Sequence, residues 1–241
     1  MKIVDKIQRK QNDLYGSRQI TIAFLGDSVT QGCFECYEPY PGGIETDFIA
    51  QWAYCERVKQ ILNKLYPSVP FSIVNAGISG ASALSGVQRV ERDVLSYDPD
   101  LVVVCFGLND SGDGADGIEN FYSNLREIFT KIREKGCECI FMTPNTLNDR
   151  ESPKLTGDLF KGLAKAFAER MQNGVMDGYV EAGKKAAREC GVTICDCYAL
   201  WKQMQSCGVN VTELLSNKLN HPDKDMQYLF AYELVRTMLQ A

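Results

Sequence analysis

Short apolar runs alternate along the chain with stretches that have the hydrophobic spacing of helices. The apolar runs cover residues 19–26, 70–77, 100–107, 137–144 and 191–197. They are continuous rather than alternating, which is typical of strands covered on both faces. Apolar residues three or four positions apart predict helices at 49–66, 118–135, 174–190 and about 222–239, with an extra amphipathic helix at 158–173.

Strands and helices in alternation predict an α/β fold. Right-handed crossovers between successive strands give a parallel sheet with helices on both faces. We therefore expect a three-layer α/β/α sandwich with a five-stranded parallel sheet. A chain of 241 residues with 45% hydrophobic content suits a single domain over residues 1–241. In such sheets ligands bind outside the carboxyl ends of the strands, so the loops that follow the strands should line one rim.

The charge balance and the hydropathy argue against two classes of partner. The formal net charge of −5 leaves no excess of Lys and Arg to neutralise nucleic acid or an anionic membrane surface. Residues 1–19 alternate charged and single apolar positions, and no run approaches the roughly 20 apolar residues of a membrane span. We predict a cytoplasmic protein without a nucleic-acid or membrane partner, and the sequence does not predict its oligomeric state.

The ten cysteines predict neither disulfides nor a metal site. Cys105 and Cys195 lie inside apolar runs, where a free cysteine behaves as a small hydrophobic residue. Cys33 and Cys36 form a C-x-x-C pair, but no second pair with zinc-site spacing completes it. We expect reduced thiols, no metal and no cofactor.

Ser28 and His221 are the candidate reactive pair. Ser28 stands in Gly-Asp-Ser directly after the first predicted strand, and His221, the only histidine, stands in "NHPD" before the last predicted helix. A serine hydroxyl needs a neighbouring base, and imidazole, with a pKa of about 6.5, suits that task. This pairing predicts activity that rises between pH 5 and 8 as His221 loses its proton. A turn-closing serine and a structural histidine stay open as alternatives.

Two further loops carry candidate hydrogen-bond donors for an oxyanion. Gly77 in "NAGISG" offers a backbone amide that no side chain shields, and Asn109 in "FGLND" offers a carboxamide. Alternatively, Gly77 only permits a tight turn and Asn109 closes an Asx-turn. Asp27 and Asp110 are expected to hold their loops through backbone hydrogen bonds.

These motifs together resemble the SGNH hydrolases, also called GDSL-type esterases and lipases. Gly-Asp-Ser, the glycine after strand two, Gly-x-Asn-Asp and His-Pro follow one another over residues 26–222 in the order of that family. The resemblance implies a flavodoxin-like fold, with Ser28 as nucleophile and His221 as base. It further implies an oxyanion hole made by the amides of Ser28 and Gly77 and the side chain of Asn109.

One position departs from the family pattern. Many members carry an Asp three residues before the histidine, where this chain has Lys218. We expect a carbonyl to orient the imidazole instead, supplied by the backbone or side chain of Ser216 or Asn217. Asp223 is another candidate, although a carboxylate after Pro222 more simply suits the start of a helix.

The predicted function is a serine esterase for short acyl groups, acetyl above all, carried on a carbohydrate. The insertions at 33–48 and 145–173 are polar and aromatic, and no long apolar stretch suggests a fatty-acyl tunnel. Tyr37 and Tyr40 are candidates to stack on a sugar ring, while helical spacing assigns Trp52 to the core. The insertion at 145–173 is a candidate lid. The alternatives are a lysophospholipase or thioesterase of the same family, and a non-catalytic sugar- or nucleotide-binding domain.

Overall fold

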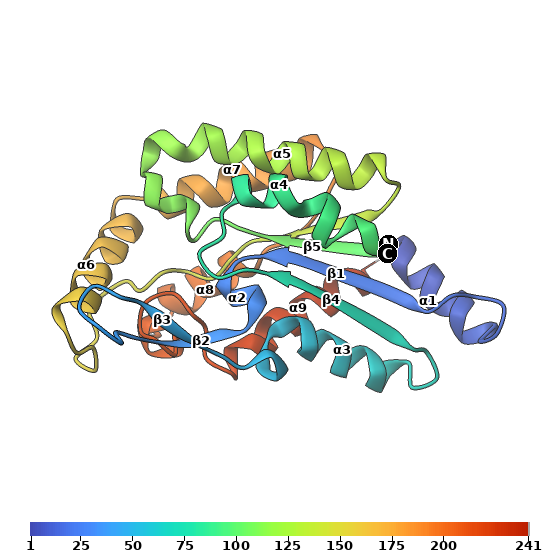
Figure 1. Cartoon of the computed structure of the whole chain (residues 1–241), viewed down its shortest axis with the longest axis horizontal. Helices are drawn as coiled ribbons and strands as arrows, with labels where there is room; N and C mark the ends of the chain where they lie inside the picture. Colours follow the sequence, from blue (N-terminus) through green and yellow to red (C-terminus); the bar gives the residue numbers. More distant parts are fainter. Residues whose placement is uncertain (241) are drawn as a thin grey trace.

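A computed structural model describes residues 1–240 and contains the predicted parallel sheet (Figure 1). The sheet order is β4-β1-β5-β6-β7, and every neighbouring pair is parallel. The strands are β1 Ile20–Gly26, β4 Phe71–Gly77, β5 Leu101–Cys105, β6 Glu138–Met142 and β7 Thr193–Cys195. Because the second strand lies outside the first and the others follow on its opposite side, this is the flavodoxin-like order, as predicted.

Helices cover both faces of the sheet. One face packs against α4 Ala83–Asp93, α5 Ile118–Glu134 and α7 Val175–Glu189. The other packs against α1 Lys2–Asn12, α3 Tyr54–Leu65, α8 Cys197–Ser206 and α9 Met226–Leu239. The short α2 Ser28–Gln31, the hairpin of β2 Cys33–Tyr37 and β3 Glu45–Phe48, and α6 Asp158–Gln172 lie beyond the carboxyl ends of the strands (Figure 1). The remaining helices are short 3-10 turns: Ala50–Trp52, Leu95–Tyr97, Asp110–Asp113, Ala115–Gly117 and Val211–Leu214.

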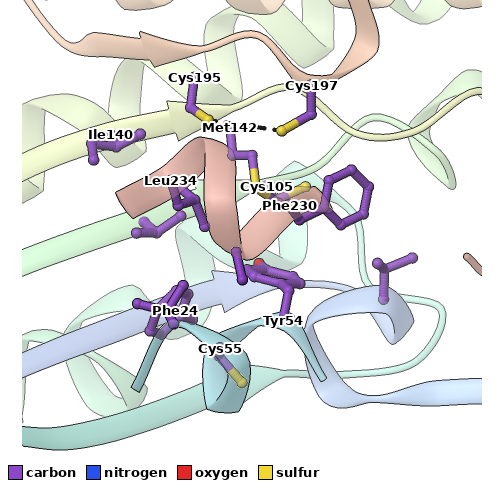
Figure 2. Packing of buried hydrophobic residues seen from close by; sticks show 14 of the residues in the cluster. Phe24, Tyr54, Cys55, Cys105, Ile140, Met142, Cys195, Cys197, Phe230 and Leu234 are labelled. Atoms are coloured by element: carbon purple, nitrogen blue, oxygen red, sulfur yellow. Dashed lines mark hydrogen bonds between the residues drawn. The ribbon is translucent and has the colours of Figure 1, made fainter. Parts of the chain in front are cut away.

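Successive residues of each central strand point into different cores. Ile22 and Phe24 of β1 join the cluster on the α3 and α9 side, whereas Leu25 joins the cluster under α4 and α5. Figure 2 shows the first cluster, where Tyr54 packs edge-on against both Phe24 and Phe230, with ring centroids 5.6 and 5.9 Å apart. Burial on both faces explains why the strands appear in the sequence as continuous apolar runs.

Two predicted helices begin later than expected. The helix predicted at 49–66 starts at Tyr54, after a 3-10 turn. The last helix starts at Met226 rather than near Pro222, because Pro222 pairs with Leu215 in an isolated β-bridge. The Asp223 carboxylate accepts the Met226 N–H at the start of this helix and so serves the helix.

The sequence did not predict α1, α4, α8 or the β2–β3 hairpin. Trp52, which was assigned to the core, is half-buried at the foot of this hairpin and packs edge-on against Phe34. All ten cysteines are free. Among residues 1–240, no helix combines the length and apolar character needed to cross a membrane.

Candidate active site

Ser28 is held at the end of the central strand β1 by a sharp turn into α2. Asp27 precedes it as helix cap, and its Oδ1 accepts the Val29 N–H at 3.0 Å. Gly32, in the left-handed conformation at φ 95°, ends this helix after four residues. The Ser28 amide, in the first turn, has no hydrogen-bond acceptor within residues 1–240. The turn therefore presents a hydroxyl and a free N–H at the same point of the rim.

His221 meets Ser28 across 193 residues of sequence. The His221 Nε2 and the Ser28 Oγ are 2.9 Å apart, and each residue is 3% exposed. On the other side of the ring, Nδ1 lies 3.0 Å from the backbone carbonyl oxygen of Phe34 in β2. A carbonyl can only accept, so Nδ1 carries the proton and Nε2 accepts from the hydroxyl. This is the tautomer that a general base for Ser28 needs.

The partner of Nδ1 is thus a carbonyl, but not one from the residues predicted to supply it. Asn217 instead uses its Oδ1 to accept the backbone N–H groups of Leu219, Asn220 and His221, which fixes the histidine loop. The Ser216 hydroxyl donates to the same Phe34 carbonyl at 2.8 Å.

Lys218, the residue in the usual Asp position, does not face the imidazole. Its ammonium donates to the carbonyls of Glu213 and Leu215, and its backbone has a positive φ of 57°. Among residues 1–240 no carboxylate bonds to the imidazole, and burial lowers the pKa of His221 to about 4, although the Phe34 carbonyl opposes the shift. The rise of activity with loss of the His221 proton, which the sequence predicts between pH 5 and 8, is therefore expected below pH 5.

The candidate oxyanion donors differ in their freedom to bind. The Asn109 Nδ2 donates one hydrogen to the Ala81 carbonyl at 2.9 Å, which leaves its second hydrogen for a ligand. The Gly77 amide donates to the Asn75 Oδ1 at 3.0 Å and so is already engaged. Gly77 has a packing reason to be glycine, because a Cβ there would lie 2.3 Å from the Gln31 nitrogen in α2.

Gly80, which the sequence reasoning missed, lies in the same "NAGISG" loop. It has a positive φ of 76°, and open space surrounds the position of a Cβ. Its N–H has no acceptor in the described part of the chain, and its neighbour Ala81 contacts the Asn109 side chain. The sequence signal that could have pointed to Gly80 is that it is the second glycine of the NAGISG loop.

Behind the nucleophile, a buried arginine connects two strand ends. The Arg89 side chain, in α4, donates to the carbonyls of Gly26 and Ala76, which stand directly before Asp27 and Gly77. Arg89 is 5% exposed, so these bonds are sheltered from water. Sequence reasoning missed Arg89 because it did not predict α4.

The two buried aspartates serve backbone amides. The Asp110 carboxylate accepts the N–H groups of Ala83 and Gly107, at 2.8 and 3.1 Å, and so joins two rim loops. Burial raises the pKa of Asp27 to about 7 and that of Asp110 to about 6. Within residues 1–240, no three His, Cys, Asp or Glu side chains gather as metal ligands would.

Comparison with known proteins places this arrangement in a family. The model of the GDSL-like lipase/acylhydrolase family matches residues 24–227. An acetylxylan esterase of Geobacillus stearothermophilus is 26% identical over 167 residues, which are 65% of this chain and 74% of the relative.

Solved structures share the fold. A crystal structure of an acetylxylan esterase from Geobacillus stearothermophilus, a catalytic variant with a histidine replaced by alanine, superposes with a TM-score of 0.67 at 21% identity, covering 92% of this chain and 95% of that one. Another is a catalytic variant at a serine. A two-domain esterase active on acetylated mannans has a TM-score of 0.66 at 19% identity. The match covers 98% of this chain but about half, 52%, of that esterase. The family match confirms the predicted class, a carboxylic ester hydrolase, and the chain therefore belongs to the GDSL-like lipase/acylhydrolase family.

Proposed function

We propose that the chain is a carbohydrate acetyl esterase that works through an acyl-enzyme on Ser28. The Ser28 Oγ attacks the acetyl carbonyl carbon while its proton passes to the His221 Nε2. The tetrahedral intermediate collapses, and the same proton passes from Nε2 to the departing sugar oxygen. Water then attacks the acetyl-serine with His221 as base again, which releases acetate and restores the hydroxyl.

The oxyanion is stabilised by donors that are already in place around Ser28. We assign the Ser28 amide and the second Nδ2 hydrogen of Asn109 to this role, with the Gly80 amide in place of the engaged Gly77 amide. Fixed donors of this kind each lower the barrier by about 2.7–4 kcal/mol, because they need no reorganisation during the reaction.

The Phe34 carbonyl takes the place of the third member of a catalytic triad. It holds the Nδ1 proton, which keeps Nε2 free to accept from Ser28, and its dipole favours the imidazolium that forms during attack. A carbonyl carries only a partial charge, so it stabilises the cation less than a carboxylate does. The enzyme then has a base that stays unprotonated into mildly acidic solution.

The carbohydrate substrate is supported by the relatives and by the rim. The relatives named above include esterases for acetylated xylan and acetylated mannan. Near His221 the rim of this chain presents Glu35 and Tyr37, which are side chains suited to hydroxyl groups and to the face of a sugar ring. A cytoplasmic location and the lack of a nucleic-acid or membrane partner stay predictions of the sequence.

The single observation that carries the proposal is the 2.9 Å contact between His221 and Ser28, with Nδ1 held by a carbonyl. Ser28→Ala is expected to lower kcat on p-nitrophenyl acetate by about 10⁶-fold, as loss of the nucleophile does in a model serine hydrolase. Ser68→Ala, at an exposed position outside the rim, is the control. Unchanged hydrolysis in Ser28→Ala would favour the non-catalytic alternative.

A series of p-nitrophenyl esters separates acetyl esterases from the lipid-directed alternatives. The proposal expects the highest kcat/KM with acetate and a steady fall as the acyl chain lengthens. A maximum at eight carbons or more would instead identify a lysophospholipase or a long-chain thioesterase.

A further inference from the structure

A groove of about 470 Å³ lies beside the catalytic histidine. Three segments that are far apart in sequence line it. They are residues 35–38 at the end of β2, residues 154–157 together with Phe160 in the first turn of α6, and residues 216–218 in the loop before His221. In Figure 1 the hairpin and α6 lie together beyond one end of the sheet. The volume is within the range of small-molecule sites, about 300–1,000 Å³.

The groove begins at residues that touch His221. Cys36 lines it, and the Cys36 Sγ is 3.8 Å from the His221 Nδ1. Asn217 also lines it and accepts the His221 backbone N–H at 3.0 Å. A molecule in this groove therefore lies on the Nδ1 side of the imidazole, with the ring between it and an ester bound at Ser28.

The lining carries groups that hydroxyl-rich ligands need. The Glu35 carboxylate has no hydrogen-bond or ion-pair partner within residues 1–240, so both its oxygens are open to donors. The Lys154 ammonium, one hydrogen of which is donated to the Glu213 carboxylate, has further hydrogens for a ligand, and Tyr37 is 45% exposed. Sugar hydroxyls both donate and accept, and the carbon face of a sugar packs on aromatic rings.

Other ligand classes suit this lining less well. Lys154 and Lys218 of the lining balance the charges of Glu35 and Glu38, so the groove has no excess positive charge for an anionic ligand such as a phosphate ester. The same carboxylates would lose hydration without compensation against an alkyl chain. A neutral ligand with many hydroxyl groups matches the whole set.

We propose that this groove binds the sugar units next to the acetylated one, so that the enzyme selects acetylated oligosaccharides over acetylated monosaccharides. This inference rests on the proposed esterase function. It assigns Tyr37 and Glu35 as specificity-determining residues, and it gives the hairpin and the segment before α6 the role of substrate walls.

The test compares kcat/KM on chemically acetylated xylotetraose with kcat/KM on p-nitrophenyl acetate, which is too small to reach the groove. For the unaltered chain, kcat/KM per acetyl group should be at least tenfold higher on acetylated xylotetraose than on acetylated xylose. Tyr37→Ala and Glu35→Ala should each lower the ratio of kcat/KM on acetylated xylotetraose to kcat/KM on p-nitrophenyl acetate at least tenfold. Tyr40→Ala is the matched control, because Tyr40 is on the same hairpin, is 66% exposed and does not line the groove.

Two results would overturn the inference: no preference for acetylated xylotetraose over acetylated xylose, or an equal change of the ratio in Tyr37→Ala and Tyr40→Ala. Glu35→Ala provides a second, exposed position if Tyr37→Ala does not fold. Failure of the esterase proposal looks different, since Ser28→Ala would then hydrolyse p-nitrophenyl acetate as fast as the unaltered chain.

Discussion

The two halves of the reactive pair are built in different ways. Ser28 is held by regular structure: it follows the central strand, Asp27 caps its helix, and Arg89 connects the backbones of two adjacent strand ends. His221 stands in a loop whose regular pairing is one isolated bridge, between Leu215 and Pro222. Its ring is oriented by a carbonyl from the β2–β3 hairpin, 187 residues away in sequence.

The sheet topology therefore sets the position of Ser28, whereas a contact between two loops sets the orientation of His221. A parallel sheet presents its strand ends at one rim, so the position of Ser28 follows from the topology. The orientation of His221 depends instead on an insertion that docks beside it. We therefore expect changes on the nucleophile side to affect kcat and stability together, and changes on the histidine side to affect the pH profile.

The largest effect after loss of Ser28 is expected for Asn109→Ala. Removing an oxyanion donor typically lowers kcat by about 10²–10³-fold. The donor acts mainly on the transition state, so KM should change little. Steady-state kinetics on p-nitrophenyl acetate provide the measurement, with Asn63→Ala on the exposed face of α3 as control. A rise of KM at constant kcat would remove Asn109 from the oxyanion hole.

Arg89→Met tests whether the nucleophile side depends on the buried connection between β1 and β4. Loss of hydrogen bonds from a buried charged donor should lower the free energy of unfolding by about 1–3 kcal/mol. Small displacements of the Ser28 turn should also lower kcat, by about 10–100-fold. Urea unfolding and kinetics measure the two effects.

The control for Arg89→Met is Arg92→Met, since the Arg92 side chain on the same helix is 76% exposed. We expect little change in either measurement for that variant. Equal effects of the two substitutions would show that Arg89 contributes no more than an exposed arginine.

The sheet could be predicted from sequence because its strands are short, continuous apolar runs. The helix α4 was missed because Gly86 and Arg89 interrupt its buried face, and tertiary contacts such as that of Gly86 with Phe106 stabilise it instead. The amphipathic α1 buries Ile3 and Ile7, but from the sequence its residues were described only as charged positions that alternate with single apolar ones. The hairpin strands carry Glu and Tyr at exposed positions, without the apolar signal of a buried strand.

For the site, sequence could identify the residue types but not every contact. Ser28 and His221 were found because one follows a strand and the other is the only histidine. The Phe34 carbonyl could not be found, because every residue has a carbonyl and the hairpin that positions this one was not predicted. The sequence also does not show which way an amide points, so it could not show that the Gly77 N–H donates to Asn75 while the Gly80 N–H stays free in the described part of the chain.

Cys36→Asp sharpens the contrast on the histidine side. In the unaltered chain kcat/KM should rise with pH around pH 4, because only the neutral imidazole accepts the serine proton. A carboxylate at position 36, where the thiol is 3.8 Å from Nδ1, favours the imidazolium and should raise this pKa by about 1–3 units. The measurement is kcat/KM between pH 3.5 and 8, with Cys36→Asn as the uncharged control.

Two results would contradict the account of the histidine. One is a rise centred between pH 6 and 7 in the unaltered chain, since burial would then not control the base. The other is an equal shift in Cys36→Asp and Cys36→Asn, because the effect would not come from charge.

The smallest effect is expected for Lys218→Asp, which restores the residue type of many family members. The Lys218 ammonium donates to the carbonyls of Glu213 and Leu215, and the Phe34 carbonyl already accepts the hydrogen bond from Nδ1. A carboxylate at 218 therefore has no direct path to the imidazole, and the pH midpoint should move by less than about 0.5 units, far less than with a carboxylate beside the ring. A shift as large as that of Cys36→Asp would mean that the histidine loop rearranges to rebuild a triad. The base would then owe its orientation to its own loop rather than to the hairpin.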